Sequence, residues 1–152
     1  MNVFVHCVLT ESGPRGRVVQ LGASAGPSHT FEQKAHPAGA VLSDIFTAFH
    51  GLTATILNRA PPLDEATLAF LAWCKKLPHG APTYFIYAGD GLVALGTWLR
   101  CLSPAVASAL MDAFPDGWVR GRVLLKRLIP GRASYSLHPL YASIMGAEPI
   151  GM

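Results

Sequence analysis

The sequence predicts a single α/β domain, residues 1–152, built on a mixed central β-sheet flanked by helices. Three observations lead to this fold class. The first 35 residues contain three runs typical of strands, separated by turn residues. Apolar residues then recur at helical spacing, and one short apolar run interrupts this helical part. This order predicts a three-strand antiparallel meander joined to parallel strands.

The three N-terminal strands follow from their composition and from the turns between them. Residues 2–9 (NVFVHCVL) and 17–23 (RVVQLGA) are rich in Val and flank the turn SGPRG, so they predict a hairpin. Residues 28–35 (SHTFEQKA) are more polar and predict a third strand at the edge of the sheet.

The remaining elements are mostly helices. Residues 39–51 carry apolar side chains at helical spacing and end at Gly51, a typical C-terminal stop. Prolines and an acidic first turn open a helix over 60–77, and the apolar run 82–89 (PTYFIYAG) predicts a strand inside the sheet. Further elements are expected at 90–102 (helix), 103–114 (helix capped by Ser103), 117–131 (short strand or turn, then a helix) and 136–146 (helix).

Composition excludes several classes of protein. Hydrophobic residues make up 51% of the chain and charged residues 14%, which is typical of a packed domain and not of a disordered one. The three cysteines lie far apart without metal-ligand spacing, so we expect reduced thiols and an intracellular protein. No run approaches the length of a membrane span, and no P-loop, GxSxG or HExxH motif is present.

Five stretches, taken in order, resemble the DnaQ-like (DEDD-type) 3′–5′ exonucleases, which have a ribonuclease H-like fold. They are VFVHCVLTESG, GRVVQLGA, FHGLT, YFIYAGDGLVALGTWL and LLKRLIPGRASYSLHPLY. The last is most similar to the three-prime repair exonuclease branch. The resemblance spans nearly the whole chain and implies an exonuclease-like domain whose relatives cleave with two divalent metal ions.

The resemblance also implies that the metal-binding acids of the family are missing. His6, Val8 and Ala94 stand where the family has its first three acids. The fourth acid and its His would follow YSLHPLY, and the chain ends at Met152, so the C-terminal helix is expected to be truncated. Hard divalent cations need carboxylate oxygens. We therefore predict no catalytic residue, no metal and no cofactor.

The resemblance implies a binding cleft as well. By this likeness His50, Gly51, Leu52 and Thr53 line the cleft beside a terminal nucleotide, and Asp90 replaces a family Asn. A plain helix stop with a solvated His explains FHGLT equally well, and both interpretations stay open.

A basic cluster and several aromatic residues are candidates for contact with nucleic acid. The cations are Arg120, Arg122, Lys126, Arg127 and Arg132. They predict either a phosphate-tracking patch or a solvated face. Trp98 is among the candidate stacking groups, with Tyr84, Tyr87, Trp118 and Tyr135.

The sequence thus predicts an inactive exonuclease-like domain that acts by binding. A protein-interaction or homo-oligomeric module is slightly favoured, because few charges leave apolar surface for an interface. Single-stranded nucleic acid is the second partner class, and no membrane partner is expected. The alternative is an active exonuclease that uses Mg or Mn with non-standard ligands such as Glu11 and Asp90.

Overall fold

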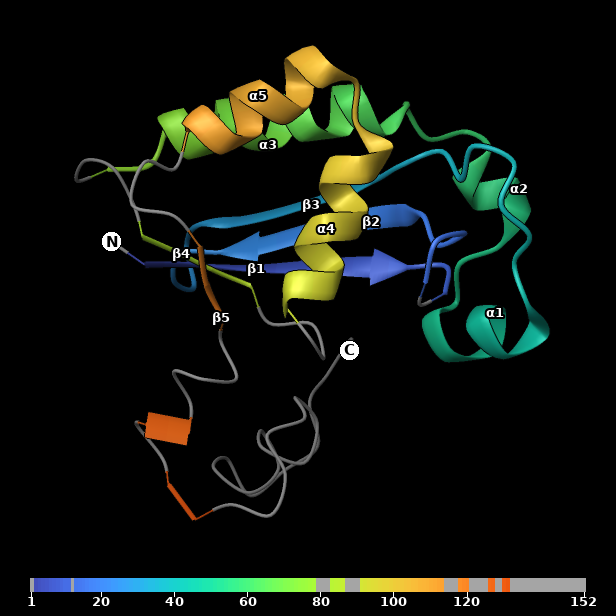
Figure 1. Cartoon of the computed structure of the whole chain (residues 1–152), viewed down its shortest axis with the longest axis horizontal. Helices are drawn as coiled ribbons and strands as arrows, with labels where there is room; N and C mark the ends of the chain where they lie inside the picture. The colour runs from blue at the N-terminus through green and yellow to red at the C-terminus, as the bar shows by residue number, and fades with distance from the viewer. Residues whose placement is uncertain are drawn as a thin grey trace.

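A five-stranded mixed sheet forms the centre of the protein, in the order β3-β2-β1-β4-β5 (Figure 1). The computed structural model describes residues 2–11, 13–78, 83–86, 91–113, 118–120, 126–127 and 130–131, and for 2, 83–86, 91–92 and 118–120 only the backbone is described. The strands are β1 (Asn2–Leu9), β2 (Val18–Ser24), β3 (Thr30–Lys34), β4 (Thr83–Ile86) and β5 (Trp118–Arg120). β1 to β3 pair antiparallel, and β4 pairs parallel with both β1 and β5. The predicted meander, its edge strand and the internal position of the apolar strand are confirmed.

Five helices surround this sheet in the described part of the chain. They are α1 (Asp44–His50), α2 (Ala54–Leu57), α3 (Leu63–Lys75), α4 (Gly91–Cys101) and α5 (Pro104–Asp112). Figure 1 shows α3 and α5 side by side above the sheet, α4 crossing it, and α1 and α2 beside the carboxyl end of β1. None of these helices is both long and apolar enough to cross a membrane.

Two helix predictions needed correction. The helix expected from residue 39 begins only at Asp44, because the backbone of Ser43 is extended, with φ −71° and ψ 157°. Ala38 and Gly39, farther upstream, are left-handed, with φ values of 53° and 82°. The Ser43 hydroxyl then caps α1 by accepting the Phe46 N–H at 3.0 Å. The short helix α2 was not predicted, since four residues are too few for a periodic pattern. The helix expected at 136–146 lies outside the described residues.

The main core lies on one face of the sheet, under α3, α4 and α5. β1 contributes its odd-numbered residues Val3, Val5 and Cys7, which are all buried there. Trp98 and Phe70 fill the centre with ring centroids 5.6 Å apart. The Trp98 Nε1–H donates to the Thr67 hydroxyl at 2.9 Å, so the one polar atom of the indole is satisfied inside the core.

A second, smaller cluster lies on the other face of β1. Its buried members are Val8, Val19, Phe46, Leu52 and Leu57. Cys7 and Val8 belong to different clusters because successive strand residues point to opposite faces. This second cluster fixes α1, α2 and the segment between them against the even-numbered face of β1.

Candidate nucleic-acid cleft

The segment FHGLT, residues 49–53, is both a helix stop and a helix start. Gly51 ends α1 with a φ of 67°, and its N–H donates to the Thr47 carbonyl at 2.8 Å. Leu52 is buried in the second cluster. Thr53 begins α2, since its hydroxyl accepts the Ile56 N–H at 3.2 Å. Ending a helix, filling the core and capping the next helix therefore account for Gly51, Leu52 and Thr53 without any ligand.

His50 has a different environment, because its exposed ring rests between two aromatic rings. Its centroid lies 4.7 Å from that of Phe46 and 4.8 Å from that of Phe49. Phe46 is buried in the second cluster, so it anchors the imidazole next to β1. Partial desolvation in this position lowers the pKa of His50.

His6 points from β1 toward the same region. It lies on the even-numbered face of β1, two residues before Val8, and its partner on β2 is Gly22, which has no side chain to cover it. The imidazole keeps an exposed surface. The protein atoms around it and, as a second cause, the charge of His50 lower its pKa. A charged His50 therefore disfavours protonation of His6.

The other two positions of the missing acids are closed to ligands. Val8 is buried in the second cluster. Ala94 is only 1% exposed and packs in the main core beside Trp98, whereas the preceding Val93 is 44% exposed. The Ala94 side chain thus faces the core and does not line a cleft. Asp90 lies outside the described residues.

The described residues do not fit a two-metal centre. Among them, no group of three or more His, Cys, Asp or Glu side chains is placed to hold an ion. Divalent magnesium and manganese need several carboxylate or carbonyl oxygens, and the position of the first acid carries an imidazole. No step of metal-assisted hydrolysis can be derived from this arrangement.

The exposed aromatic residues differ from those expected. Trp98 is fully buried, so its prediction as a stacking group is wrong. Phe4 and Phe49 are 50% and 75% exposed. Phe4 lies two residues before His6 on the same face of β1, and the Phe49 ring contacts that of His50. The alternation of β1 could have indicated Phe4, but nothing in the sequence distinguished Phe49 from the core residues of its helix.

The predicted basic cluster is only partly described. Lys126 and Arg127 are helical and exposed. Arg120 belongs to β5, where only the backbone is described, and Arg122 and Arg132 lie outside the described residues. The prediction of a phosphate-tracking patch stays a prediction.

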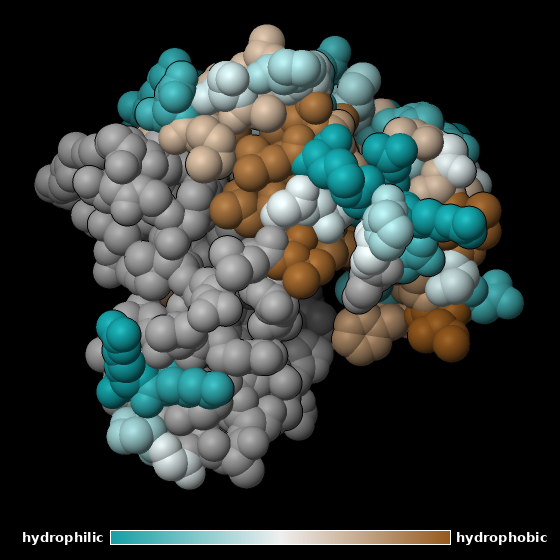
Figure 2. Space-filling model, in the orientation of Figure 1, coloured by the Kyte–Doolittle hydropathy of each residue, from teal (hydrophilic) through white to brown (hydrophobic). Residues whose placement is uncertain are grey.

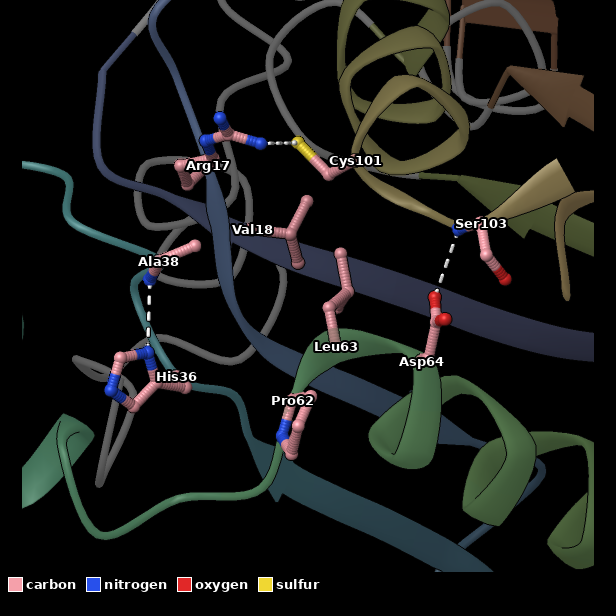
Figure 3. A pocket seen from close by; sticks show the side chains of 9 residues that line it. All are labelled: Arg17, Val18, His36, Ala38, Pro62, Leu63, Asp64, Cys101 and Ser103. Atoms are coloured by element: carbon pink, nitrogen blue, oxygen red, sulfur yellow. Dashed lines mark hydrogen bonds between the residues drawn. The ribbon is translucent and has the colours of Figure 1, made fainter.

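A separate pocket of about 270 Å³ contains none of the predicted cleft residues (Figure 3). An Arg17 guanidinium N–H donates to the Cys101 Sγ at 3.5 Å on one side, and the Asp64 carboxylate accepts the Ser103 N–H at 3.0 Å on the other. Its walls come from residues spread between 17 and 103, so no local pattern indicated it. The first contact joins the residue before β2 to the end of α4, and the second joins α3 to the N-cap of α5, so both have a structural role.

Known proteins resemble this chain in their three-dimensional structure, but no match was found by sequence. No family model matches the chain, and no curated protein matches it. The nuclease domain of 3′hExo, a DEDDh family member bound to rAMP, superposes with a TM-score of 0.69 at 16% identity, over 97% of this chain and 79% of that one. Exonuclease X in complex with 5′-overhanging duplex DNA gives 0.61 at 15% identity, over 99% and 76%.

A third similar structure describes 3′-end-specific recognition of a histone mRNA stem-loop by a 3′-exonuclease. It gives a TM-score of 0.67 at 13% identity, over 96% of this chain. The chain spans only 55% of that protein. The sequence-based expectation about the fold is confirmed: this protein has the α/β, ribonuclease H-like fold of the DnaQ-like 3′–5′ exonucleases.

Proposed function

We propose that this domain binds the end of a nucleic-acid strand in its exonuclease-like cleft and does not cleave it. The observation that carries the proposal is the exposed imidazole of His6, which by the family resemblance stands at the position of the first acid. It lies on the same face of β1 as the second cluster, against which the His50 ring packs through Phe46. Imidazole is a poor ligand for the hard ion Mg²⁺, whereas its N–H can donate a hydrogen bond to a phosphate oxygen.

The surroundings of the histidine pair support binding of a nucleotide. Phe4, two residues before His6 on β1, and Phe49, whose ring contacts that of His50, are both exposed. Sequence-tolerant stacking of a base on an aromatic ring contributes about 1–3 kcal/mol. The similar solved structures include one with a histone mRNA stem-loop and one with duplex DNA. Nucleic acid is therefore the partner class that the cleft supports best.

Incubation with a 3′-labelled single-stranded oligonucleotide tests the proposal. We expect the oligonucleotide to stay intact with magnesium or manganese, and to bind with an affinity that falls as salt is raised from about 50 to 200 mM. Phe49→Ser is expected to weaken binding several-fold through lost stacking. Metal-dependent shortening that His6→Ala abolishes would establish the alternative of an active exonuclease with non-standard ligands.

Self-association or binding of a protein partner is the second candidate function. Val41, Ile45 and Phe49 follow one another at a spacing of four residues and are 90%, 82% and 75% exposed. Figure 2 shows apolar side chains gathered over α1 at the lower right of this view. Apolar surface of this kind marks interaction sites in many proteins, which supports the homo-oligomeric module expected from the composition.

Light scattering across protein concentration checks the second candidate. We expect the wild-type mass to rise with concentration, and Ile45→Ser to keep the protein monomeric, because that substitution removes the central side chain of the exposed row. Leu68→Ser is a matched control, since Leu68 is exposed on the distant helix α3. A monomer at all concentrations would contradict self-association and leave a heterologous partner as the remaining form of this candidate.

A further inference from the structure

We propose that the pocket between β2, the start of α3 and the end of α4 binds a small zwitterion with an apolar body, the chemical class of the aliphatic α-amino acids. The pocket has a volume of about 270 Å³ and is lined by none of the residues of the nucleic-acid cleft. This second ligand site is therefore independent of the proposed nucleic-acid binding, and each has its own test.

The pocket holds two opposite charges that do not pair with each other. Arg17 lines one side and Asp64 the other, and Figure 3 shows Val18 and Leu63 between them. In the part of the chain that the structure describes, Lys34 and Glu32 form the only ion pair. A guanidinium and a carboxylate that face one small space without meeting match the two charged ends of a dipolar ligand, whereas a simple anion would be repelled by Asp64.

Contacts around Arg17 fix this residue and leave donors for a ligand. The Thr10 hydroxyl accepts the Arg17 backbone N–H at 3.0 Å, and the Thr10 N–H donates to the Arg17 carbonyl at 2.9 Å. The guanidinium donates to the Cys101 Sγ at 3.5 Å, and a thiol sulfur is only a weak acceptor. Because a guanidinium has five N–H donors in a fork, it can still bind a ligand carboxylate through two of them.

The opposite wall is fixed in a similar way. Asp64 lies in the first turn of α3, and its Oδ1 accepts the Ser103 N–H at 3.0 Å. A carboxylate has about four acceptor sites, so Asp64 keeps capacity for a ligand ammonium group. His36 forms a further wall, where its Nδ1 accepts the Ala38 N–H at 3.0 Å and its own N–H donates to the Pro61 carbonyl at 2.8 Å. The walls are thus ordered before a ligand enters, which lowers the cost of binding.

The surface between the charges is apolar. Val18 and Leu63 are 1% and 8% exposed, and both belong to the main core. They offer a rigid surface to an aliphatic side chain. Pockets for drug-sized ligands usually measure about 300–1,000 Å³. The smaller space here favours a ligand of amino-acid size over a nucleotide.

Calorimetric titration with L-valine, L-leucine and L-methionine tests the site. We expect at least one of them to bind with a dissociation constant of about 0.1–1 mM. The matched probes are the carboxylate and the amine that each amino acid becomes without its amino or its carboxyl group, for leucine 4-methylpentanoate and 3-methylbutylamine. Each probe lacks one charged contact and should bind at least about tenfold more weakly than its amino acid.

Substitutions assign the binding to the two charges. Arg17→Gln and Asp64→Asn are each expected to weaken it at least about tenfold. Asp64→Asn keeps an oxygen that can accept the Ser103 N–H, so the link to α5 is preserved. Arg15→Gln and Asp112→Asn are the matched controls, because both residues are exposed and line no part of this pocket. Thermal unfolding checks that all four variants are folded.

Cys101 reports occupancy of the pocket in the wild type. It lines the pocket and is partly exposed, whereas Cys7 and Cys74 are buried. Alkylation of Cys101 by iodoacetamide, followed by mass spectrometry of its peptide, should slow several-fold when the bound amino acid is saturating. An unchanged rate would place the amino acid elsewhere and overturn the site.

The remaining outcomes also decide the question. No binding of the three amino acids up to about 10 mM, which corresponds to a very weak site, overturns the proposal. Probes that bind as tightly as their amino acid, or charge variants that retain wild-type affinity, overturn the recognition of a zwitterion. Arg17→Gln and Asp64→Asn should leave oligonucleotide binding unchanged, so a failure of this site and a failure of the nucleic-acid cleft are seen in separate assays.

Discussion

Replacing Trp98 by alanine is expected to lower the free energy of unfolding by about 3–5 kcal/mol. The side chain is fully buried at the centre of the main core and contacts the Phe70 ring. Truncation leaves a cavity where the indole stood, and the surrounding rings can relax only in part. Because whole domains are stable by about 5–15 kcal/mol, much of the stability would be lost. Urea unfolding followed by circular dichroism measures the change.

A second pair of variants separates packing from hydrogen bonding at the same place. Thr67→Val keeps the volume and removes the hydroxyl that accepts the Trp98 Nε1–H, so we expect a loss of about 1–3 kcal/mol. Trp98→Phe removes the donor as well as part of the ring. The double variant Thr67→Val/Trp98→Phe should lose less stability than the sum of the two single losses, because both substitutions break the same hydrogen bond.

For the alanine variant, a loss of stability below about 1 kcal/mol would contradict the assignment of Trp98 to the core.

The second large effect is expected from Leu57→Ala, which should destabilise the histidine cleft selectively. Leu57 is fully buried in the second cluster, and its truncation costs about 2–5 kcal/mol. Since this cluster holds α1 against β1, its weakening should let α1 open without unfolding the sheet. Hydrogen exchange is expected to accelerate at the amides of Thr47 and Gly51, which donate in the α1 ladder and its cap.

Leu110→Ala provides the matched control. Leu110 is equally buried, but it belongs to the main core under α5. Its loss should lower global stability by a similar amount and leave oligonucleotide affinity unchanged at temperatures where the domain is folded. Leu57→Ala should instead weaken oligonucleotide binding. Identical exchange patterns in the two variants would show that the second cluster is no separate unit.

Much of the fold could be predicted, because local patterns suffice for it. The alternation in residues 2–9 and 17–23, the turn between them and the Ser103 cap all reappear in the structure. Signals of this kind involve neighbours in sequence, so tertiary context changes them little. Helix α1 is the exception: its apolar pattern extends to Val41, while the extended backbone of Ser43 and its cap set its start.

Less of the candidate site than of the fold could be predicted from the sequence. The sequence by itself determined that an imidazole and an aliphatic side chain, His6 and Val8, lie on one face of the first strand, since the identity of a residue and its place in a strand are local properties. Only the tertiary structure decided that α1 places Phe46 and, beside it, His50 on the even-numbered face of β1. It also decided that Ala94 and Trp98 face the core and that Phe49 is exposed. The physical reason is that these outcomes depend on how α1 and α4 rotate about their axes when they pack on the two faces of β1. That rotation is fixed by packing among residues about forty to ninety positions apart, such as Val8 and Phe46 in the second cluster and Val5 and Trp98 in the main core, which no local pattern records.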